Sequence, residues 1–145
     1  MKWNDYYLNI AKAAAERSKD PSTKCGACVV GPDNVIISTG FNGFPRGITD
    51  TEVRLEDREQ KYKLVIHAEV NAILFARRDL RDCTLYVYPL MPCDACALLI
   101  IQAGIKEVVS VVPSQELYMR WGASQAKTAE LFEEAGVELR LLRWP

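Results

Sequence analysis

Histidine is almost absent from this chain of 145 residues, because His67 is its only histidine. Long apolar runs are missing as well: no stretch approaches the roughly 20 apolar residues that a membrane-spanning helix needs. The first residues, "MKWNDYYLNI", are amphipathic and contain no apolar signal-peptide segment. These absences predict a cytoplasmic protein with no membrane partner.

An excess of charge of either sign is also lacking. The chain carries 18 basic and 19 acidic side chains, a formal net charge of −1. This balance argues against broad adhesion to nucleic acid, so we expect no nucleic-acid partner, although a local basic pocket is compatible with it. The five cysteines are odd in number, and no secretory signal accompanies them. A disulfide framework is therefore not expected, and metal binding or core packing explains the cysteines better.

The order of the expected elements predicts an α/β protein with one domain, residues 1–145. Residues 3–18 show helical apolar spacing and end at "DP". The β-rich runs "CGACVV" and "NVIISTGF" flank the turn sequence "GPDN" and predict a hairpin. From residue 82 onward strand and helix alternate, which is typical of parallel strands joined by helical crossovers. We therefore expect a mixed five-stranded sheet, with an antiparallel first hairpin, a parallel remainder and helices on both faces in three α/β/α layers.

Three further segments bear on function. Residues 43–62 are polar and contain "GFPRG", so they are interpreted as a long loop, which in a compact domain is often functional. "KLVIHAEVNAILFARR" and "CDACALLIIQAG" are apolar almost all round a helix, so both helices should be buried. A helix is expected at residues 123–135, after a loop with Tyr118, Arg120 and Trp121. That loop either packs against the domain or contacts a base or a phosphate.

Cys93 and Cys96 stand three residues apart in "PCDAC", at the predicted start of a helix. Positions i and i+3 share a helix face, and the partial positive charge at a helix N-terminus favours thiolates. Two thiolates and the neutral imidazole of His67 match zinc, which prefers tetrahedral sulfur and nitrogen ligands. Three protein ligands leave the fourth position open, as in catalytic zinc sites, where bound water has a pKa of about 7.

Glu69 follows His67 by two residues, and residues i and i+2 do not share a helix face. The two side chains are therefore poorly placed to bind one ion together. At a helix start, His67 can bind the metal while the Glu69 carboxylate reaches the water on it. A carboxylate there can take a proton from the water and pass it to a leaving group.

"KCGAC" contains a second Cys-X-X-Cys pair, which with Cys93 and Cys96 would make a four-cysteine structural zinc module without catalysis. Side chains alternate along a strand, so Cys25 and Cys28 should point to opposite faces, which argues against that module. Cys83 begins a strand and is interpreted as a small buried apolar residue.

His-X-Glu followed by Pro-Cys-X-X-Cys is the signature of zinc-dependent nucleobase deaminases. The chain resembles the cytidine and deoxycytidylate deaminase family, and within it most closely the branch that acts on deoxycytidylate (dCMP). The resemblance covers most of residues 5–140 and is carried by "DPSTKCGACVV", "GFNGFPRG", "HAEVNAI", "TLYVYPLMPCDAC" and "LIIQAGIKEVV". It implies a cytidine-deaminase-like fold and one catalytic Zn²⁺ in each chain.

The resemblance also implies a reaction, the hydrolysis of dCMP to dUMP and ammonia, which supplies dUMP for thymidylate synthesis. Zinc would be held by the three ligands named above and would activate a water that adds to C4 of cytosine. Glu69 would move the proton from that water to N3 and then to the departing ammonia.

For substrate binding, the resemblance places Asn42 on the sugar and the backbone N–H of Ala68 on the base carbonyl. Lys24 or Arg46 would meet the phosphate, and the sequence does not choose between them. Asn71 either contacts the residues that bind zinc and substrate, or it caps its helix or packs in the core. Three residues open the first strand near where family members hold substrate: Ser22, Thr23 and Lys24.

Regulation is a further implication, with dCTP as activator and dTTP as inhibitor in a homo-oligomer, which we expect to be a hexamer. Mg²⁺ would enter only with a bound triphosphate. The family usually has tyrosine where this chain has Phe41, which removes a hydroxyl and keeps the aromatic ring. The alternative is that residues 43–62 form only a lid over the substrate. The effector site would consist of Gly40, Phe41, Asn42, Gly43 and Arg46.

Three other activities fit parts of the pattern: deamination of dCTP as well as dCMP, deamination of free cytidine or cytosine, and deamination of adenosine in tRNA. "GFNGFPRG" favours nucleotides over free nucleosides. The acidic balance and the lack of a basic C-terminal arm disfavour tRNA, because phosphate contacts need clustered lysine and arginine.

Overall fold

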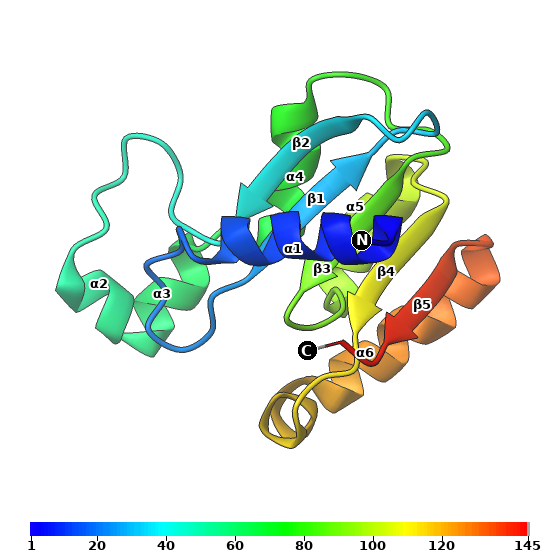
Figure 1. Ribbon diagram of the computed structural model, residues 1–145. Coiled ribbons are helices and arrows are strands. Elements are labelled where there is room, and N and C mark those ends of the chain that lie inside the picture. Colours follow the sequence, from blue (N-terminus) through cyan, green and yellow to red (C-terminus); the bar gives the residue numbers. More distant parts are fainter. Residues whose placement is uncertain (145) are drawn as a thin grey trace.

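Five strands form one mixed sheet in the computed structural model, which describes residues 1–144 (Figure 1). β1 and β2 pair antiparallel, whereas β3, β4 and β5 are parallel, so the expected α/β sheet is confirmed. A second antiparallel pair, β1 with β3, joins the hairpin to the parallel part, a junction that the sequence pattern does not specify. The strand order is β2-β1-β3-β4-β5, with the bounds β1 (Gly26–Val30), β2 (Ile36–Phe41), β3 (Thr84–Tyr88), β4 (Glu107–Val111) and β5 (Glu138–Leu142).

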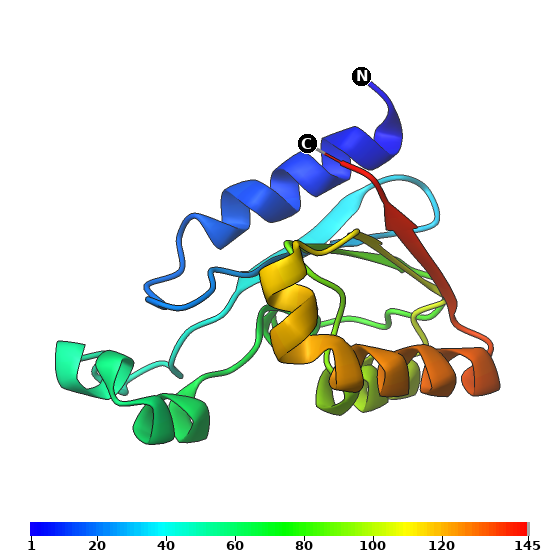
Figure 2. The ribbon, with the colours of Figure 1, turned by 90° about the horizontal axis from the view of Figure 1, so that it is seen from below.

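Helices cover both faces of the sheet and give the three expected layers (Figure 2). On one face lies α1 (Trp3–Ala15); on the other lie α4 (Ala68–Ala76), α5 (Asp94–Gln102) and α6 (Gln115–Ala135). Alternation along β1 divides its side chains between two cores. Ala27 and Val29 pack in the core on the side of α4 and α5, whereas Cys28 and Val30 pack in the core beneath α1. Among residues 1–144, no helix combines the length and the apolar character that crossing a bilayer requires.

The close approach of α4 to the sheet depends on Gly40. A Cβ at this position would lie 2.5 Å from the backbone oxygen of Ala68 and 2.5 Å from the backbone nitrogen of Ala72. Asn71 fastens the same contact, because its Nδ2 donates a hydrogen bond of 2.8 Å to the carbonyl of Phe41. Asn71 therefore links α4 to the end of β2.

The prediction of a structureless loop over residues 43–62 is wrong. Two short helices lie in this region, α2 (Glu52–Glu56) and α3 (Arg58–Leu64). Each begins at a capping side chain: the Thr51 hydroxyl and the Asp57 carboxylate accept hydrogen bonds from backbone N–H groups of the following turn. The helices were missed because local capping forms them within a polar stretch that has little apolar periodicity.

The helix predicted from residue 63 to residue 78 is interrupted. α3 ends at Leu64, the chain is extended before His67, and α4 begins only at Ala68. Two backbone hydrogen bonds between Ile66 and Gly43, of 2.8 and 3.1 Å, hold the break open. A pairing between segments so far apart cannot be read from helical spacing alone.

The expectation that α4 and α5 are buried all round is also wrong for the single chain. Each helix buries one face and leaves large apolar side chains in water. The exposed fractions are 58% for Leu74, 42% for Phe75, 59% for Leu98 and 48% for Leu99. The helix predicted at residues 123–135 begins earlier, at Gln115, so Tyr118, Arg120 and Trp121 belong to α6 and not to a loop.

Candidate metal and catalytic site

Two helices begin at the predicted metal ligands. His67 is the N-cap residue of α4 and has extended backbone angles, and Cys93 is the N-cap residue of α5. The Cys93 Sγ accepts a hydrogen bond of 3.5 Å from the backbone N–H of Cys96. Cys93 thus lies at the positive end of α5, where a thiolate is favoured.

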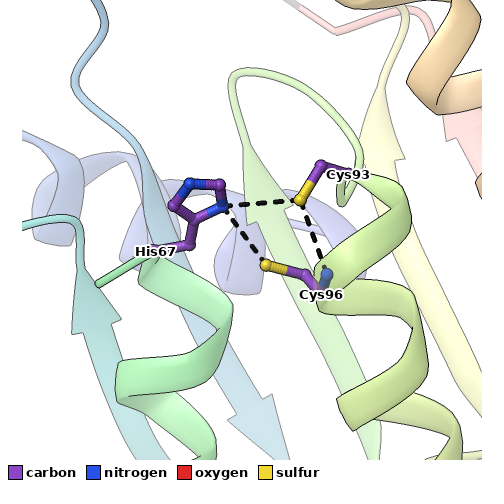
Figure 3. Close-up of side chains that lie close together, drawn as sticks. All are labelled: His67, Cys93 and Cys96. Atoms are coloured by element: carbon purple, nitrogen blue, oxygen red, sulfur yellow. Dashed lines mark hydrogen bonds between the residues drawn. The ribbon is translucent and has the colours of Figure 1, made fainter. Parts of the chain in front are cut away.

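Three donor atoms converge from these helix starts. The Nδ1 of His67 lies 3.5 Å from the Sγ of Cys93 and 3.3 Å from the Sγ of Cys96 (Figure 3). Zinc–nitrogen and zinc–sulfur bonds of about 2.0 and 2.3 Å at a tetrahedral angle would separate nitrogen from sulfur by about 3.5 Å. The spacing therefore fits three corners of a zinc tetrahedron. No other group of three His, Cys, Asp or Glu side chains in residues 1–144 has ligand atoms within 4.8 Å of one another.

The two thiols of this cluster differ in their affinity for protons. A hydrogen bond from Cys96 lowers the pKa of Cys93 to about 4, with a further contribution from His67. The pKa of Cys96 is raised, because its proton is held against Cys93 and its side chain is buried. Zinc binds thiolates, so loading this site displaces the proton of Cys96.

Glu69 lies in the first turn of α4, and only 5% of the residue is exposed. Burial raises the pKa of its carboxyl group to about 7, and the neighbouring His67 opposes the shift. The carboxylate is not part of the three-donor cluster. A carboxyl group that titrates near neutrality beside a metal site, without binding the metal, is suited to proton transfer.

A pocket of about 70 Å³ opens over these groups. It contains His67, Ala68, Glu69 and Cys93, and its exposed rim includes Tyr62. Of the predicted substrate residues, four line it and one does not: Lys24 is exposed and lies outside the lining. The other lining residues are Asp20, Ser22, Thr23, Cys25, Asn42, Lys61, Val65, Val87, Leu90, Met91, Arg120, Trp121 and Gln125.

The comparisons with known proteins agree with this site. Residues 1–112 match the family described as "Cytidine and deoxycytidylate deaminase zinc-binding region". The chain belongs to the cytidine and deoxycytidylate deaminase family. It is 42% identical to a deaminase encoded in the luxG 3' region of Aliivibrio fischeri, over 97% of this chain and 94% of that protein.

Other relatives of this chain are deoxycytidylate deaminases. The Homo sapiens enzyme is 40% identical over 97% of this chain and 79% of its own length. The apo crystal structure of the dCMP deaminase from cyanophage S-TIM5 superposes with a TM-score of 0.76, covering 98% of this chain and 100% of the phage chain. At 24% identity, that last likeness concerns the fold.

Cys25 and Cys28 do not form a second ligand pair in the deaminase. Cys25 packs on the side of α4 and lines the pocket, whereas Cys28 is buried in the core beneath α1. The four-cysteine module is therefore excluded by the geometry. Cys83 is buried in the core, as predicted.

Asn42, the predicted sugar-binding residue, is held by a network of hydrogen bonds and one ion pair that the sequence does not predict. Asn42 accepts a hydrogen bond from the backbone of Cys25 and donates to the backbone of Thr23 and the carboxylate of Asp20. The Nζ of Lys61, which is 3% exposed, lies 3.0 Å from the other Asp20 oxygen. Lys61 lies within residues 43–62, which the sequence predicted as a polar loop, and its partner, 41 residues away, becomes visible only in the fold.

The N-terminal half of α6 also lines the pocket, through Arg120, Trp121 and Gln125. Gln125 is 6% exposed, and its Nε2 has no hydrogen-bond partner in residues 1–144. The aromatic-plus-arginine composition of the segment was the available sequence signal. Arg120 and Trp121 line the pocket, whereas Tyr118 is exposed and lies outside its lining.

A second cavity of about 170 Å³ lies beside the first and shares Asp20, Asn42, Lys61 and Val65 with it. Of the five predicted effector residues, Phe41, Asn42 and Gly43 line this cavity. Gly40 is buried under α4, and the guanidinium of Arg46 lies 5.1 Å from the centre of the Phe75 ring. The remaining lining residues are Arg17, Lys19, Phe44, Asp50 and Leu55.

Proposed function

We propose that this enzyme catalyses the zinc-dependent hydrolytic deamination of dCMP to dUMP, with release of ammonia. The observation that carries the proposal is the cluster of His67 Nδ1 and the two cysteine sulfurs, with Glu69 buried beside it in one pocket. The 40% identity to deoxycytidylate deaminases over nearly the whole chain supports dCMP as the substrate. The product is dUMP, which feeds thymidylate synthesis.

Metal binding and proton transfer are carried out by different residues. His67, Cys93 and Cys96 would hold Zn²⁺, which when bound lowers the pKa of a coordinated water to about 7. Glu69 accepts the proton from the attacking water and delivers it to N3 of the cytosine ring. The same carboxyl group then takes the proton of the hydroxyl added at C4 and delivers it to the amino group, which leaves as ammonia when the C4–N bond breaks. A pKa of about 7 suits both transfers.

Substrate binding uses the walls of the same pocket. The backbone N–H of Ala68, at the start of α4, donates to the carbonyl oxygen of the base. Asn42 faces the sugar, and its Oδ1, which accepts one backbone hydrogen bond, has a second lone pair for a sugar hydroxyl. Ser22 and Thr23 form the adjacent part of the rim.

The proposal also covers regulation by dCTP and dTTP. The second cavity holds the side chains of Arg17 and Lys19 beside the ring of Phe41, a combination that fits a nucleoside triphosphate with its Mg²⁺. Asp50 is the opposing acid there and is paired with Lys19 at 3.0 Å. Because Lys61 lines both cavities, a ligand in one would act on the network that positions Asn42 in the other.

We further propose that the enzyme is a homo-oligomer, a hexamer, that uses the apolar face of α4 and α5. This face consists of the four exposed side chains Leu74, Phe75, Leu98 and Leu99. The four side chains lie on two helices that contact each other. Exposed apolar side chains that gather on one surface mark association sites in soluble proteins.

The test is the formation of dUMP and ammonia from dCMP by the zinc-loaded protein. Cytidine, dCTP and a tRNA anticodon stem-loop serve as competing substrates in parallel. Faster turnover of the stem-loop than of dCMP would reverse the assignment, and equal turnover of dCTP and dCMP would widen it to both nucleotides.

A further inference from the structure

A third space, a wide hollow, adjoins the mouth of the active pocket. It has a volume of about 450 Å³ and is lined by Arg58 and Tyr62 of α3 and by Arg120 and Trp121 of α6. Three of these residues, Tyr62, Arg120 and Trp121, also line the inner pocket, so the hollow lies directly beside it. A group attached to a base in the inner pocket would project into this hollow.

The hollow is positively charged. Both of its ionic side chains are guanidinium groups, and both residues are exposed. The acidic residues of the adjoining inner pocket do not cancel them: Asp20 is paired with Lys61, and Glu69 is buried beside the metal ligands. An anion therefore has a favourable position at the mouth, between α3 and α6.

Arg120 already reaches across that mouth. Its guanidinium donates a hydrogen bond of 3.2 Å to the hydroxyl of Thr23, which lies on the opposite side of the pocket. A neutral hydroxyl is a weaker acceptor for a guanidinium than a phosphate oxygen, which forms charge-assisted and bidentate hydrogen bonds. An arriving phosphate would displace Thr23 without requiring Arg120 to leave its position.

The same part of α6 carries an independent sign of a ligand. Gln125 is buried in the pocket lining, and its Nε2 has no hydrogen-bond partner in residues 1–144. Because buried amide groups are nearly always paired, this donor indicates that the pocket is complete only with a bound molecule. Gln125 follows Trp121 by four residues, so the two share one face of α6.

We infer that Arg120, assisted by Arg58 from the opposite side, binds the 5'-phosphate of the substrate and makes the enzyme selective for nucleotides over nucleosides. This inference rests on the function proposed above. It replaces both candidates that the sequence offered for the phosphate. Lys24 lies outside the pocket lining, and the Arg46 guanidinium lies over the ring of Phe75.

The test compares the kcat/KM of Arg120→Gln for dCMP and for deoxycytidine, which differ only in the phosphate. The value for dCMP should fall by about 10- to 100-fold, the usual effect of losing a hydrogen bond to a charged group. The value for deoxycytidine should stay near that of the wild type. Competitive inhibition of dCMP turnover by inorganic phosphate should weaken in the same variant.

Two controls make the result specific. Arg81→Gln removes the same charge from an exposed position before β3, at the far end of the strand from the site, and should change neither substrate. Arg120→Lys keeps the charge but loses the planar fork, and should retain part of the preference for dCMP.

Equal losses for dCMP and deoxycytidine, or no loss for dCMP, would overturn the inference. In both cases the wild-type enzyme would still turn over dCMP, so the proposed function would stand. A wild-type protein that deaminates neither compound would instead contradict the proposed function.

Discussion

Glu69 is the only acidic side chain that is buried among residues 1–144. An isolated buried carboxyl group destabilises a folded protein when it is charged, and here burial raises its pKa to about 7. A proton carrier works best when its pKa lies near the working pH. The burial of Glu69 fits the proton-transfer role that we propose for it.

Glu69→Gln should keep its zinc and its fold and should lower dCMP turnover by about 10²–10⁴-fold, the range for general acid–base catalysis. The amide has the same size but cannot accept the proton. The rate of dUMP formation and the metal content of the same sample measure the two effects. Exposed Glu134→Gln is the matched control and should behave as wild type. A Glu69→Gln enzyme with nearly normal turnover would exclude the proton-transfer role.

Site residues differ in how well the sequence predicts them. His67, Glu69 and the Cys93-X-X-Cys96 pair are predictable because short spacing and helix starts define them locally. Arg120 and Gln125 are not, because their approach to the pocket requires α6 to fold back beside the site. Lys61 is unpredictable for the same reason, since its ion pair joins positions 41 residues apart.

Among the elements, apolar periodicity predicted the strands and α1. It placed the start of α6 eight residues too late and failed for α2 and α3. Those two helices begin at Thr51 and Asp57, whose side chains cap a polar segment. Periodicity also missed the break before His67, because the pairing of Ile66 with Gly43 is a tertiary contact. That break matters for function, since it makes His67 a helix N-cap.

Gly40→Ala should destabilise the enzyme by about 1–3 kcal/mol or more, the usual cost of overpacking a core. The new Cβ would meet the backbone of Ala68 and Ala72 at 2.5 Å and push α4 away from β2. Denaturant unfolding of the zinc-loaded protein measures the loss.

Gly122→Ala is the control for this change. Its Cβ would meet only the Tyr118 ring at 3.4 Å, and alanine is the better helix former by about 1 kcal/mol. The control should be neutral or stabilising. A Gly40→Ala protein as stable as the wild type would show that α4 is not held at its closest approach to the sheet.

At the scale of the whole molecule, the exposed apolar face lies on α4 and α5, the two helices that begin at the metal ligands. A partner subunit on this face would therefore contact the elements that carry the site. The sequence predicted apolar character all round both helices, and an oligomer would restore the burial that the single chain lacks. The proposed hexamer thus offers a route from effector binding to catalysis.

If dCTP and dTTP regulate the enzyme as proposed, dCTP with Mg²⁺ should shift the dCMP saturation curve to lower dCMP concentrations, and dTTP should shift it to higher ones. Each effector must bind two states of the protein with different affinity for this to occur. Arg17→Gln, which alters the second cavity, should weaken both shifts and preserve turnover at saturating dCMP. Hyperbolic curves that neither triphosphate moves would rule the regulation out.

Measuring dUMP, ammonia and zinc in one preparation tests whether a His-Cys-Cys zinc site deaminates dCMP. We expect about one zinc per chain and equal amounts of dUMP and ammonia. We also expect faster turnover of dCMP than of cytidine or a tRNA anticodon stem-loop. His67→Ala should lose zinc and turnover together. A folded, zinc-loaded protein that forms no dUMP from dCMP would contradict the account.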